Sequence, residues 1–275
     1  MPNFIVGVRL HDYGKGTPDG LFGQVSADGF AAVQLAYKKC VPTVKSYADV
    51  TDALVAETVA AEKAHHIQVA VLGTYVELAI NDESRLCNVA DFKSQLAVCK
   101  ALGAGCIGTE TTAMSKQPAG TTRAQAQELL CRSLAEILPA AEALGVTVGI
   151  EPVTYHSMNS AAATRHILDT MRSPNLKVIF DMSNLVSAEN VDAQDRIWYD
   201  MGTLLGDQIV AVHFKGQAFA PDGSLLHTSL EESRTDYAGA FAMLRQLPQP
   251  ALPVLREEAV PARAASDIAF MKGFF

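Results

Sequence analysis

The stretch Gly145-Val146-Thr147-Val148-Gly149-Ile150-Glu151-Pro152 predicts a short buried strand that ends on a carboxylate. Side chains alternate between the two faces of a strand, so Val148 and Ile150 share one face and Glu151 lies on the other. Pro152 has no amide hydrogen and therefore ends the pairing of the strand. A carboxylate in this place either pairs with a nearby cation or helix N-terminus, or serves an active site as a ligand or base.

Three later strands end in a similar way, which favours the second interpretation. Each is a short apolar run followed by a residue that can bind a metal or carry a proton. The three runs and the residues that follow them are Lys177-Val178-Ile179-Phe180 before Asp181, Ile209-Val210-Ala211-Val212 before His213, and Pro253-Val254-Leu255-Arg256 before Glu257-Glu258. Four successive strands that end in Glu, Asp, His and Glu indicate one shared site, although any one of these residues alone is explained equally well by a local ion pair.

The whole chain alternates between strand and helix patterns. Strands are predicted over residues 4–9, 31–35, 68–73 and 106–110, with four more beginning at residues 146, 177, 209 and 253. Helical periodicity covers residues 53–62, 91–102 and 122–144, and Asp236 is a predicted N-cap of a later helix. Regular alternation of this kind requires a parallel sheet covered by helices. Eight units without a second domain predict a single (β/α)₈ barrel over residues 1–275; the alternative, an open doubly wound sheet, lacks a G-x-G-x-x-G motif after the first strand.

Composition limits the partners of the protein. The chain has 275 residues, is 49% hydrophobic, and carries a formal net charge of −8. It has no basic block, so neither nucleic acid nor a membrane surface is an expected partner. No apolar run approaches the roughly 18 residues of a spanning helix. The start of the chain lacks a signal-peptide pattern, and five scattered cysteines without a C-x-x-C pair are typical of a reducing cytoplasm. A cytoplasmic location is therefore predicted.

In a barrel of this type the carboxyl ends of the strands form the mouth, where active sites lie. Glu151, Asp181, His213 and Glu257 would then meet along one arc of that mouth. Three carboxylates in one place repel each other unless a cation holds them. Oxygen ligands with one imidazole suit a single divalent ion, namely Mn²⁺, Mg²⁺, Co²⁺ or Zn²⁺.

These strand ends carry a resemblance to a known family. They resemble the sugar phosphate isomerase/epimerase family of xylose-isomerase-like barrels, through Ile150-Glu151-Pro152, Phe180-Asp181-Met182-Ser183-Asn184, Val212-His213-Phe214-Lys215 and Leu255-Arg256-Glu257. The resemblance implies a divalent metal, such as manganese, held by Glu151, Asp181, His213 and Glu257. The glutamate of this family precedes a proline by about four residues, and Pro261 fits that spacing from Glu257 rather than Glu258. The alternation of side chains along the strand does not by itself decide between Glu257 and Glu258.

The resemblance also implies a reaction: epimerisation or isomerisation of a sugar or sugar phosphate. The metal would chelate two adjacent substrate oxygens and stabilise the enediolate that forms when the proton beside the carbonyl is removed. Glu151 and Glu257 would be the acid/base pair on opposite faces of the carbon. Alternatives are a keto-inositol-type dehydratase, which uses the same metal site and expels a hydroxyl, and a barrel that binds a metabolite without turnover. An apurinic-site nuclease is disfavoured because the negative charge repels DNA.

Three residues are candidates for substrate binding: His156, Asn184 and Lys215. Asn184 stands where related epimerases often have a histidine, so it can donate a hydrogen bond to a hydroxyl but cannot take a proton. Phe219 stands where ketohexose epimerases often have an arginine that grips the substrate. The sugar is therefore not named by the sequence. Related enzymes are commonly dimers or tetramers, which predicts a homodimer or homotetramer.

Overall fold

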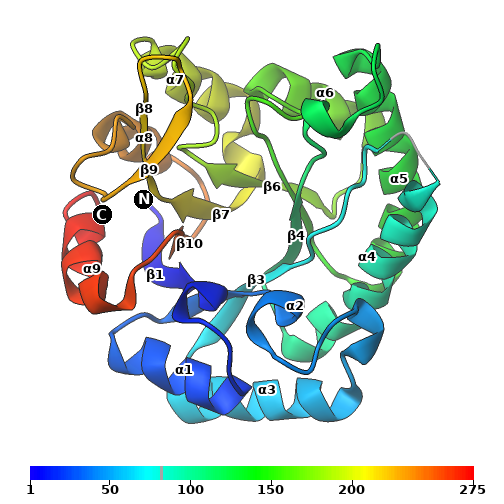
Figure 1. Cartoon of the computed structure of the whole chain (residues 1–275), viewed down its shortest axis with the longest axis vertical. Helices are drawn as coiled ribbons and strands as arrows, with labels where there is room; N and C mark the ends of the chain where they lie inside the picture. The colour runs from blue at the N-terminus through cyan, green and yellow to red at the C-terminus, as the bar shows by residue number, and fades with distance from the viewer. Residues whose placement is uncertain (81–82) are drawn as a thin grey trace.

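The protein is a closed barrel of parallel strands surrounded by helices (Figure 1), as seen in a computed structural model that describes residues 1–80 and 83–275. Around the barrel, neighbouring strands follow the order β1-β10-β7-β6-β5-β4-β3-β2. The barrel strands of the described residues are β1 Asn3–Arg9, β2 Ala32–Leu35, β3 Gln68–Gly73, β4 Cys106–Glu110, β5 Val148–Glu151, β6 Leu176–Asp181, β7 Ile209–Phe214 and β10 Ala251–Arg256. The predicted (β/α)₈ fold is confirmed.

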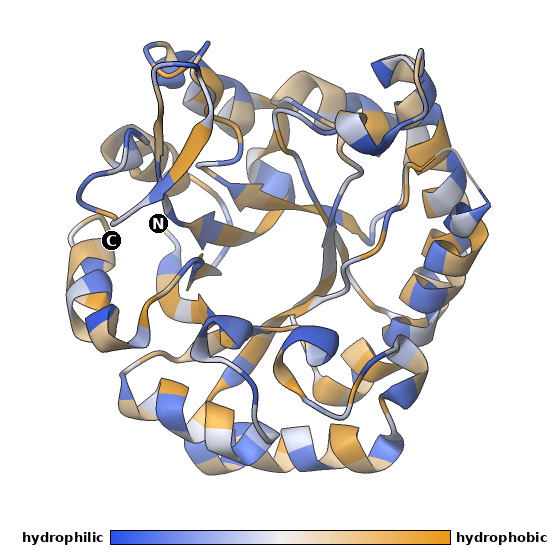
Figure 2. Cartoon of the chain, in the orientation of Figure 1, coloured by the Kyte–Doolittle hydropathy of each residue, from blue (hydrophilic) through white to orange (hydrophobic). Residues whose placement is uncertain are grey.

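Helices form the outer layer, and Figure 2 shows that they carry both hydrophobic and hydrophilic stretches. The α-helices of the described residues are α1 Pro18–Ala27, α2 Tyr37–Cys40, α3 Asp52–His65, α4 Ser84–Leu102, α5 Arg123–Leu144, α6 Ala161–Met171, α7 Gln194–Leu205, α8 Tyr237–Leu244 and α9 Ala264–Lys272. Short 3₁₀ turns lie at Leu10–Tyr13, Tyr47–Asp49, Met114–Lys116, Gly206–Gln208 and Pro261–Arg263. Within the described residues, no helix is both long and apolar enough to cross a membrane.

Capping residues fix where several helices begin and end. Thr122 accepts a hydrogen bond from the amide of Gln125 and opens α5, as a capping box does. Gly145 ends the same helix in the left-handed conformation, with φ of 68°, which glycine adopts without strain. Asp236 caps α8 by accepting from the amide of Gly239, which confirms the predicted N-cap.

The larger core lies between the strands and the helices, and a smaller one fills the inside of the barrel. The inner core is made of small or branched residues, including Cys106, Ile179 and Leu255. Gly108 and Gly149 make room for Ile179, since a Cβ at these glycines would lie 2.5 Å and 2.9 Å from its side chain. Gly149 therefore faces the barrel interior, and so does Glu151, two residues further along the strand.

The structure departs from the prediction at a hairpin and at several boundaries. The antiparallel strands β8 (Gly216–Phe219) and β9 (Leu225–Thr228) form a two-stranded sheet after β7, which the sequence had not predicted. Helix α4 begins at Ser84 rather than Asp91, and β5 begins at Val148 rather than Val146. Val146 still lies in the core, but its amide bonds to the carbonyl of Ala141 at the helix end instead of joining the sheet.

Candidate functional site

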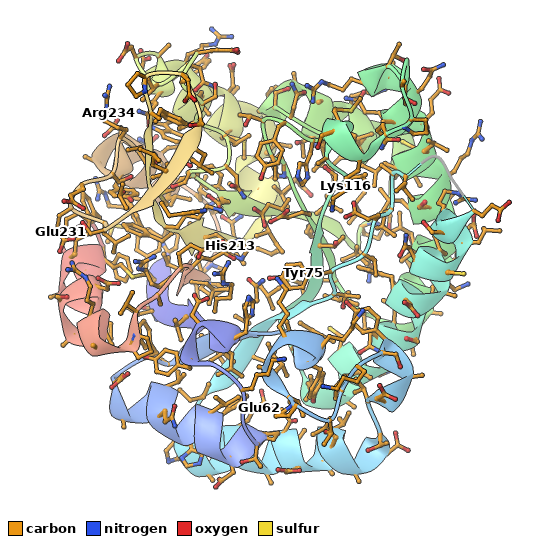
Figure 3. The ribbon with its side chains drawn as sticks, in the orientation of Figure 1. Glu62, Tyr75, Lys116, His213, Glu231 and Arg234 are labelled. Carbon is orange, nitrogen blue, oxygen red and sulfur yellow. The ribbon has the colours of Figure 1, made fainter. Side chains whose placement is uncertain are left out.

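The ends of four neighbouring strands bring the predicted ligands together. Asp181 on β6 is the register partner of His213 on β7, and His213 is paired in turn with Leu255 on β10, two residues before Glu257. Ligand atoms of Glu151, Asp181 and His213 all lie within 4.8 Å of one another, and all three side chains are buried. The imidazole Nδ1 of His213 lies 3.1 Å from Oε2 of Glu151 and 3.5 Å from Oε1 of Glu257. Figure 3 shows His213 over the centre of the barrel.

Asp181 is held rigidly because each of its oxygens has a separate partner. Its Oδ1 accepts hydrogen bonds from the backbone amides of Ser183, at 2.7 Å, and Asn184, at 2.8 Å. Its Oδ2 lies 2.8 Å from the Nζ of Lys215. The loop that follows β6 therefore folds back on the carboxylate, which fixes the carboxylate plane and leaves Oδ2 directed toward the other charged groups.

Lys215 supplies a buried positive charge between two of the carboxylates. Its Nζ also lies 3.5 Å from Oε2 of Glu257, and the side chain is 9% exposed. Burial alone would lower the pKa of Lys215, but the negative charges of Asp181 and Glu257 outweigh it and raise that pKa. The predicted substrate-binding residue thus already has two ionic partners within the protein.

The donor atoms of the site suit a metal cation. Burial disfavours the charged imidazole of His213, yet Glu257 and Glu151 raise its pKa to about 9. Its Nε2 has no hydrogen-bond partner among the described residues. Carboxylate oxygens and an imidazole nitrogen that converge within 4.8 Å are the donor set of divalent transition metals. The residues therefore fit a divalent metal, which would replace the proton on His213.

Glu257 and Glu258 face different ways, which separates the two candidates for the ligand on β10. The amide of Glu257 donates to the carbonyl of Phe214 at 3.0 Å, so Glu257 continues the sheet and its buried side chain enters the site. Glu258 adopts φ of 55°, a conformation that non-glycine residues rarely adopt, and its carboxylate turns to Arg9 at 2.9 Å. Of the two, Glu257 is thus the carboxylate that lies against His213, and its role in chemistry stays a prediction. Its inclusion as a metal ligand remains a prediction, since it lies beside the three-residue cluster.

Arg9, at the end of β1, supports Glu257 and was missed by the sequence interpretation. Its guanidinium lies 3.8 Å from Oε2 of Glu257 and 2.7 Å from Oδ1 of Asp12, and Asp12 in turn accepts from the amide of Ala259. Burial of Glu257 opposes its charge, but His213, Lys215 and Arg9 lower its pKa to about 2. Glu257 is therefore ionised at neutral pH.

The other predicted substrate residues lie on the same side of the mouth. Asn184 donates from Nδ2 to Oε1 of Glu151 at 2.6 Å, which orients that carboxylate. His156 is buried in the loop after β5, with Nε2 3.9 Å from Oε2 of Glu110. Burial lowers the pKa of His156 to about 4, and burial together with Glu151 raises the pKa of Glu110 to about 7. His156 lies in the loop outside the three-residue cluster, whereas Glu110 is the register partner of Glu151 and lines the same small cavity as Glu151 and His213.

A small cavity lies inside this ring of charges. It has a volume of about 10 Å³ and is lined by Glu151, His213 and Glu257 on one side and by Tyr75 on the other. That volume is about what one water molecule needs. Tyr75 accepts a hydrogen bond from Gln34 at 2.9 Å, and neither residue had been predicted as part of the site. The only feature of the sequence that could have identified Gln34 and Tyr75 is their position near the ends of β2 and β3.

Comparisons with known proteins agree with the barrel fold. No curated protein sequence matches the chain. Among solved structures, the 3-keto-D-glucoside 4-epimerase of E. coli is 17% identical, with a TM-score of 0.72 over 98% of this chain and 100% of its own. A D-tagatose 3-epimerase-like protein is 13% identical, with a TM-score of 0.78 over 98% and 96% of the two chains. The IolI protein, described with a zinc atom, is 15% identical, with a TM-score of 0.75 over 98% and 96%.

At these identities the likenesses show the fold and leave the reaction open. The family model described as the xylose isomerase-like TIM barrel matches residues 22–273, which is nearly the whole chain. The predicted resemblance is therefore confirmed at the level of the superfamily. The chain belongs to the xylose isomerase-like TIM barrel family.

Proposed function

We propose that the protein is a divalent-metal-dependent epimerase or isomerase that acts on a small ketose or a ketose derivative. One observation carries the proposal. The buried cluster of Glu151, Asp181 and His213 lies at the mouth of the barrel, with the ionised Glu257 against the same imidazole. Its structural neighbours include proteins described as sugar epimerases, which supports the same class of substrate.

Epimerisation requires two groups that exchange a proton with carbon from opposite sides. Glu257 comes from β10, the neighbour of β7 on one side, and Glu151 comes from β5, which lies beyond β6 on the other side. Their carboxylates reach His213 Nδ1 from these two directions, at 3.5 Å and 3.1 Å. We assign them as the acid/base pair that removes and returns the proton beside the carbonyl.

Asp181 and His213 are assigned to hold the metal, with Glu151 and Glu257 as further ligands. When bound, a divalent ion supplies stabilisation of the negative charge that develops on the substrate oxygens. Asn184 keeps Glu151 in one orientation through its 2.6 Å hydrogen bond. Lys215 keeps Asp181 and Glu257 in place; contact of Lys215, Asn184 or His156 with a substrate hydroxyl stays a prediction.

Deuterium exchange tests the proposal. The protein is incubated in D₂O with ketopentoses, ketohexoses and their phosphates, with Mn²⁺ or with EDTA. We expect metal-dependent incorporation of deuterium at the carbon beside the carbonyl. Glu151→Gln and Glu257→Gln should each lower the rate by about 10²–10⁴, the usual contribution of general acid–base catalysis.

Glu258→Gln is the matched control, because Glu258 is the adjacent carboxylate but pairs with Arg9 away from the cluster. The Glu258→Gln variant should retain deuterium exchange. Full activity of Glu151→Gln would contradict the assigned role. Loss of water from the substrate instead of exchange would establish the keto-inositol-type dehydratase, and tight sugar binding without either reaction would establish a metabolite-binding barrel.

The proposal also includes a cytoplasmic protein that forms a homodimer or homotetramer and binds neither nucleic acid nor membrane. The net charge of −8 and the absence of a basic block support the last point. Light scattering after gel filtration measures the oligomeric state, and a monomeric mass would overturn it.

A further inference from the structure

A second, larger hollow opens beside the charged cluster. It has a volume of about 710 Å³ and lies between the loop after β5, the loop after β6 and the β8–β9 hairpin. We call it the outer groove; among its lining residues are Arg123, Tyr155, Asn184, Gln217, Phe219 and Leu225. Figure 1 shows the hairpin beside the chain that leads into α7, and a Cβ on Gly223 at the hairpin turn would lie 3.6 Å from Ala188.

The size of the two cavities decides where a substrate can lie. The inner cavity of about 10 Å³ has room for an ion or one water molecule, so a sugar cannot enter it. The outer groove, at about 710 Å³, lies in the range of about 300–1,000 Å³ typical of pockets for drug-sized ligands. A substrate whose reacting carbon faces the cluster must extend outward, and this groove offers space for more than a single small ring.

Asn184 connects the two spaces. Its side chain lines the outer groove, and the same amide donates to Oε1 of Glu151 at 2.6 Å. The adjacent Ser183 also lines the groove, while its amide holds Oδ1 of Asp181. A molecule in the groove is therefore separated from the proposed acid/base residue by one side chain.

The lining of the groove indicates a neutral, ring-shaped ligand. Phe219 and the half-exposed Tyr155 supply aromatic surface, on which sugar and aromatic rings stack. The single cation among the lining residues, Arg123, donates a hydrogen bond to the backbone carbonyl of His156. Glu189 and Asp222 add two negative charges to the wall. A phosphate needs several free cations or amides, so this wall does not favour one.

We propose that the outer groove binds a second ring, joined to the reacting sugar through a glycosidic bond. The proposal rests on the proposed function and extends its substrate from ketoses to glycosides that carry a ketone. In this proposal the reacting ring is the glycosyl unit, whose first carbon is locked as an acetal, so the ketone that acidifies the neighbouring carbon must lie at another position of that ring. The substrate class is therefore a keto-glycoside with a neutral sugar or aromatic group as its second ring.

The experiment compares two substrates that differ only in the second ring. Methyl and phenyl β-D-glucosides, each oxidised to a ketone at one ring carbon, are incubated in D₂O with the Mn²⁺-loaded protein. We expect kcat/KM for exchange to be about tenfold or more higher for the phenyl compound. Phe219→Ala and Tyr155→Ala should each reduce this preference severalfold.

Tyr199→Ala is the matched control, because Tyr199 is also exposed but lies on α7 outside the groove. It should keep the full preference. Phe219→Leu, which removes the aromatic ring but preserves apolar volume, replaces Phe219→Ala if the alanine variant lowers the melting temperature. Equal kcat/KM for both substrates in the unmodified protein, or an unchanged preference in the groove variants, would overturn the proposal.

A binding measurement separates this inference from the proposed reaction. Calorimetry with the unoxidised phenyl and methyl glucosides needs no turnover. Tighter binding of the phenyl compound that depends on Phe219, with no exchange from any substrate, would support the groove and reject the reaction. Exchange without any preference for the second ring would support the reaction and reject the groove.

Discussion

Replacement of Lys215 by methionine tests the charge arrangement most directly. The Nζ of Lys215 lies 2.8 Å from Oδ2 of Asp181 and 3.5 Å from Oε2 of Glu257, and the side chain is almost fully buried. Methionine keeps an unbranched apolar side chain and removes the positive charge. The two carboxylates then lose their common cation while they remain buried.

The magnitude follows from the buried ion pair. Two unit charges about 4 Å apart attract by about 4 kcal/mol at an effective dielectric constant of about 20. Removal of one partner of a buried pair lowers stability by about 3–5 kcal/mol, because the other charge is left uncompensated. We therefore expect Lys215→Met to reduce the free energy of unfolding in EDTA by about 3–5 kcal/mol. For a chain of this size that corresponds to a fall of about 6–20 °C in the melting temperature.

Divalent metal should offset this loss in part. Without Lys215, a cation at Glu151, Asp181 and His213 meets less repulsion, so Mn²⁺ should bind the variant more tightly than the unmodified protein. A ligand at 100 times its Kd stabilises the folded state by about 2.7 kcal/mol. Mn²⁺ should therefore raise the melting temperature of Lys215→Met more than that of the unmodified protein.

The assay is urea and thermal unfolding followed by circular dichroism, in EDTA and in Mn²⁺. Lys177→Met is the matched control, since Lys177 also lies on a barrel strand but contacts the neutral Gln208 at 2.8 Å. The control should lose less than about 1 kcal/mol, the usual value of one hydrogen bond. An equally small loss for Lys215→Met in EDTA would refute the view that Lys215 compensates the buried carboxylates.

Three further predictions concern the ligands, the core and pH. His213→Ala should weaken Mn²⁺ binding because it removes the imidazole donor. Metal analysis after dialysis should then show less than one ion per chain. An unchanged number of bound ions would mean that the metal site lies elsewhere. Asp267→Asn should lower the unfolding free energy by about 3 kcal/mol, measured in urea, because Arg256, 2.7 Å away, is left buried without its charge partner. Burial lowers the pKa of His156 from 6.5 to about 4, so the unfolded chain binds more protons between these values and stability falls as pH drops through them. Titration of the His156 imidazole resonances by NMR checks this, and a midpoint near 6.5 would contradict it.

The sequence predicts the cluster well because strand ends have a fixed place in this fold. Carboxyl ends of parallel barrel strands must meet at one mouth, so a metal-binding residue at each end is enough to bring Glu151, Asp181 and His213 together. The alternation of side chains along β7 and the residue after it also predicts part of the site. His213 and Lys215 are two residues apart, so their side chains point the same way and both enter the site. Their spacing predicts a shared direction but does not say that Lys215 pairs with Asp181.

Other parts of the site depend on contacts between distant residues, which a single sequence does not reveal. Arg9 meets Glu257 and Glu258 only because β1 and β10 close the barrel. The β8–β9 hairpin has short strands, and β9 is exposed or only partly buried, so no long apolar alternation announces it. Its one local signal is Pro221-Asp222-Gly223, a turn sequence in which Gly223 adopts φ of 82°.

The order of charges around the mouth explains how so many carboxylates can be buried together. β7 places His213 and Lys215 between Asp181 on β6 and Glu257 on β10, so positive groups stand between negative ones. Arg9 adds a third positive group beyond Glu257. These cations belong to the chain itself, and the fold therefore does not depend on a bound metal for charge balance. Removal of metal by EDTA should then abolish exchange while the near-ultraviolet circular dichroism of the protein stays unchanged; loss of that signal in EDTA would mean that Lys215, His213 and Arg9 do not balance the site on their own.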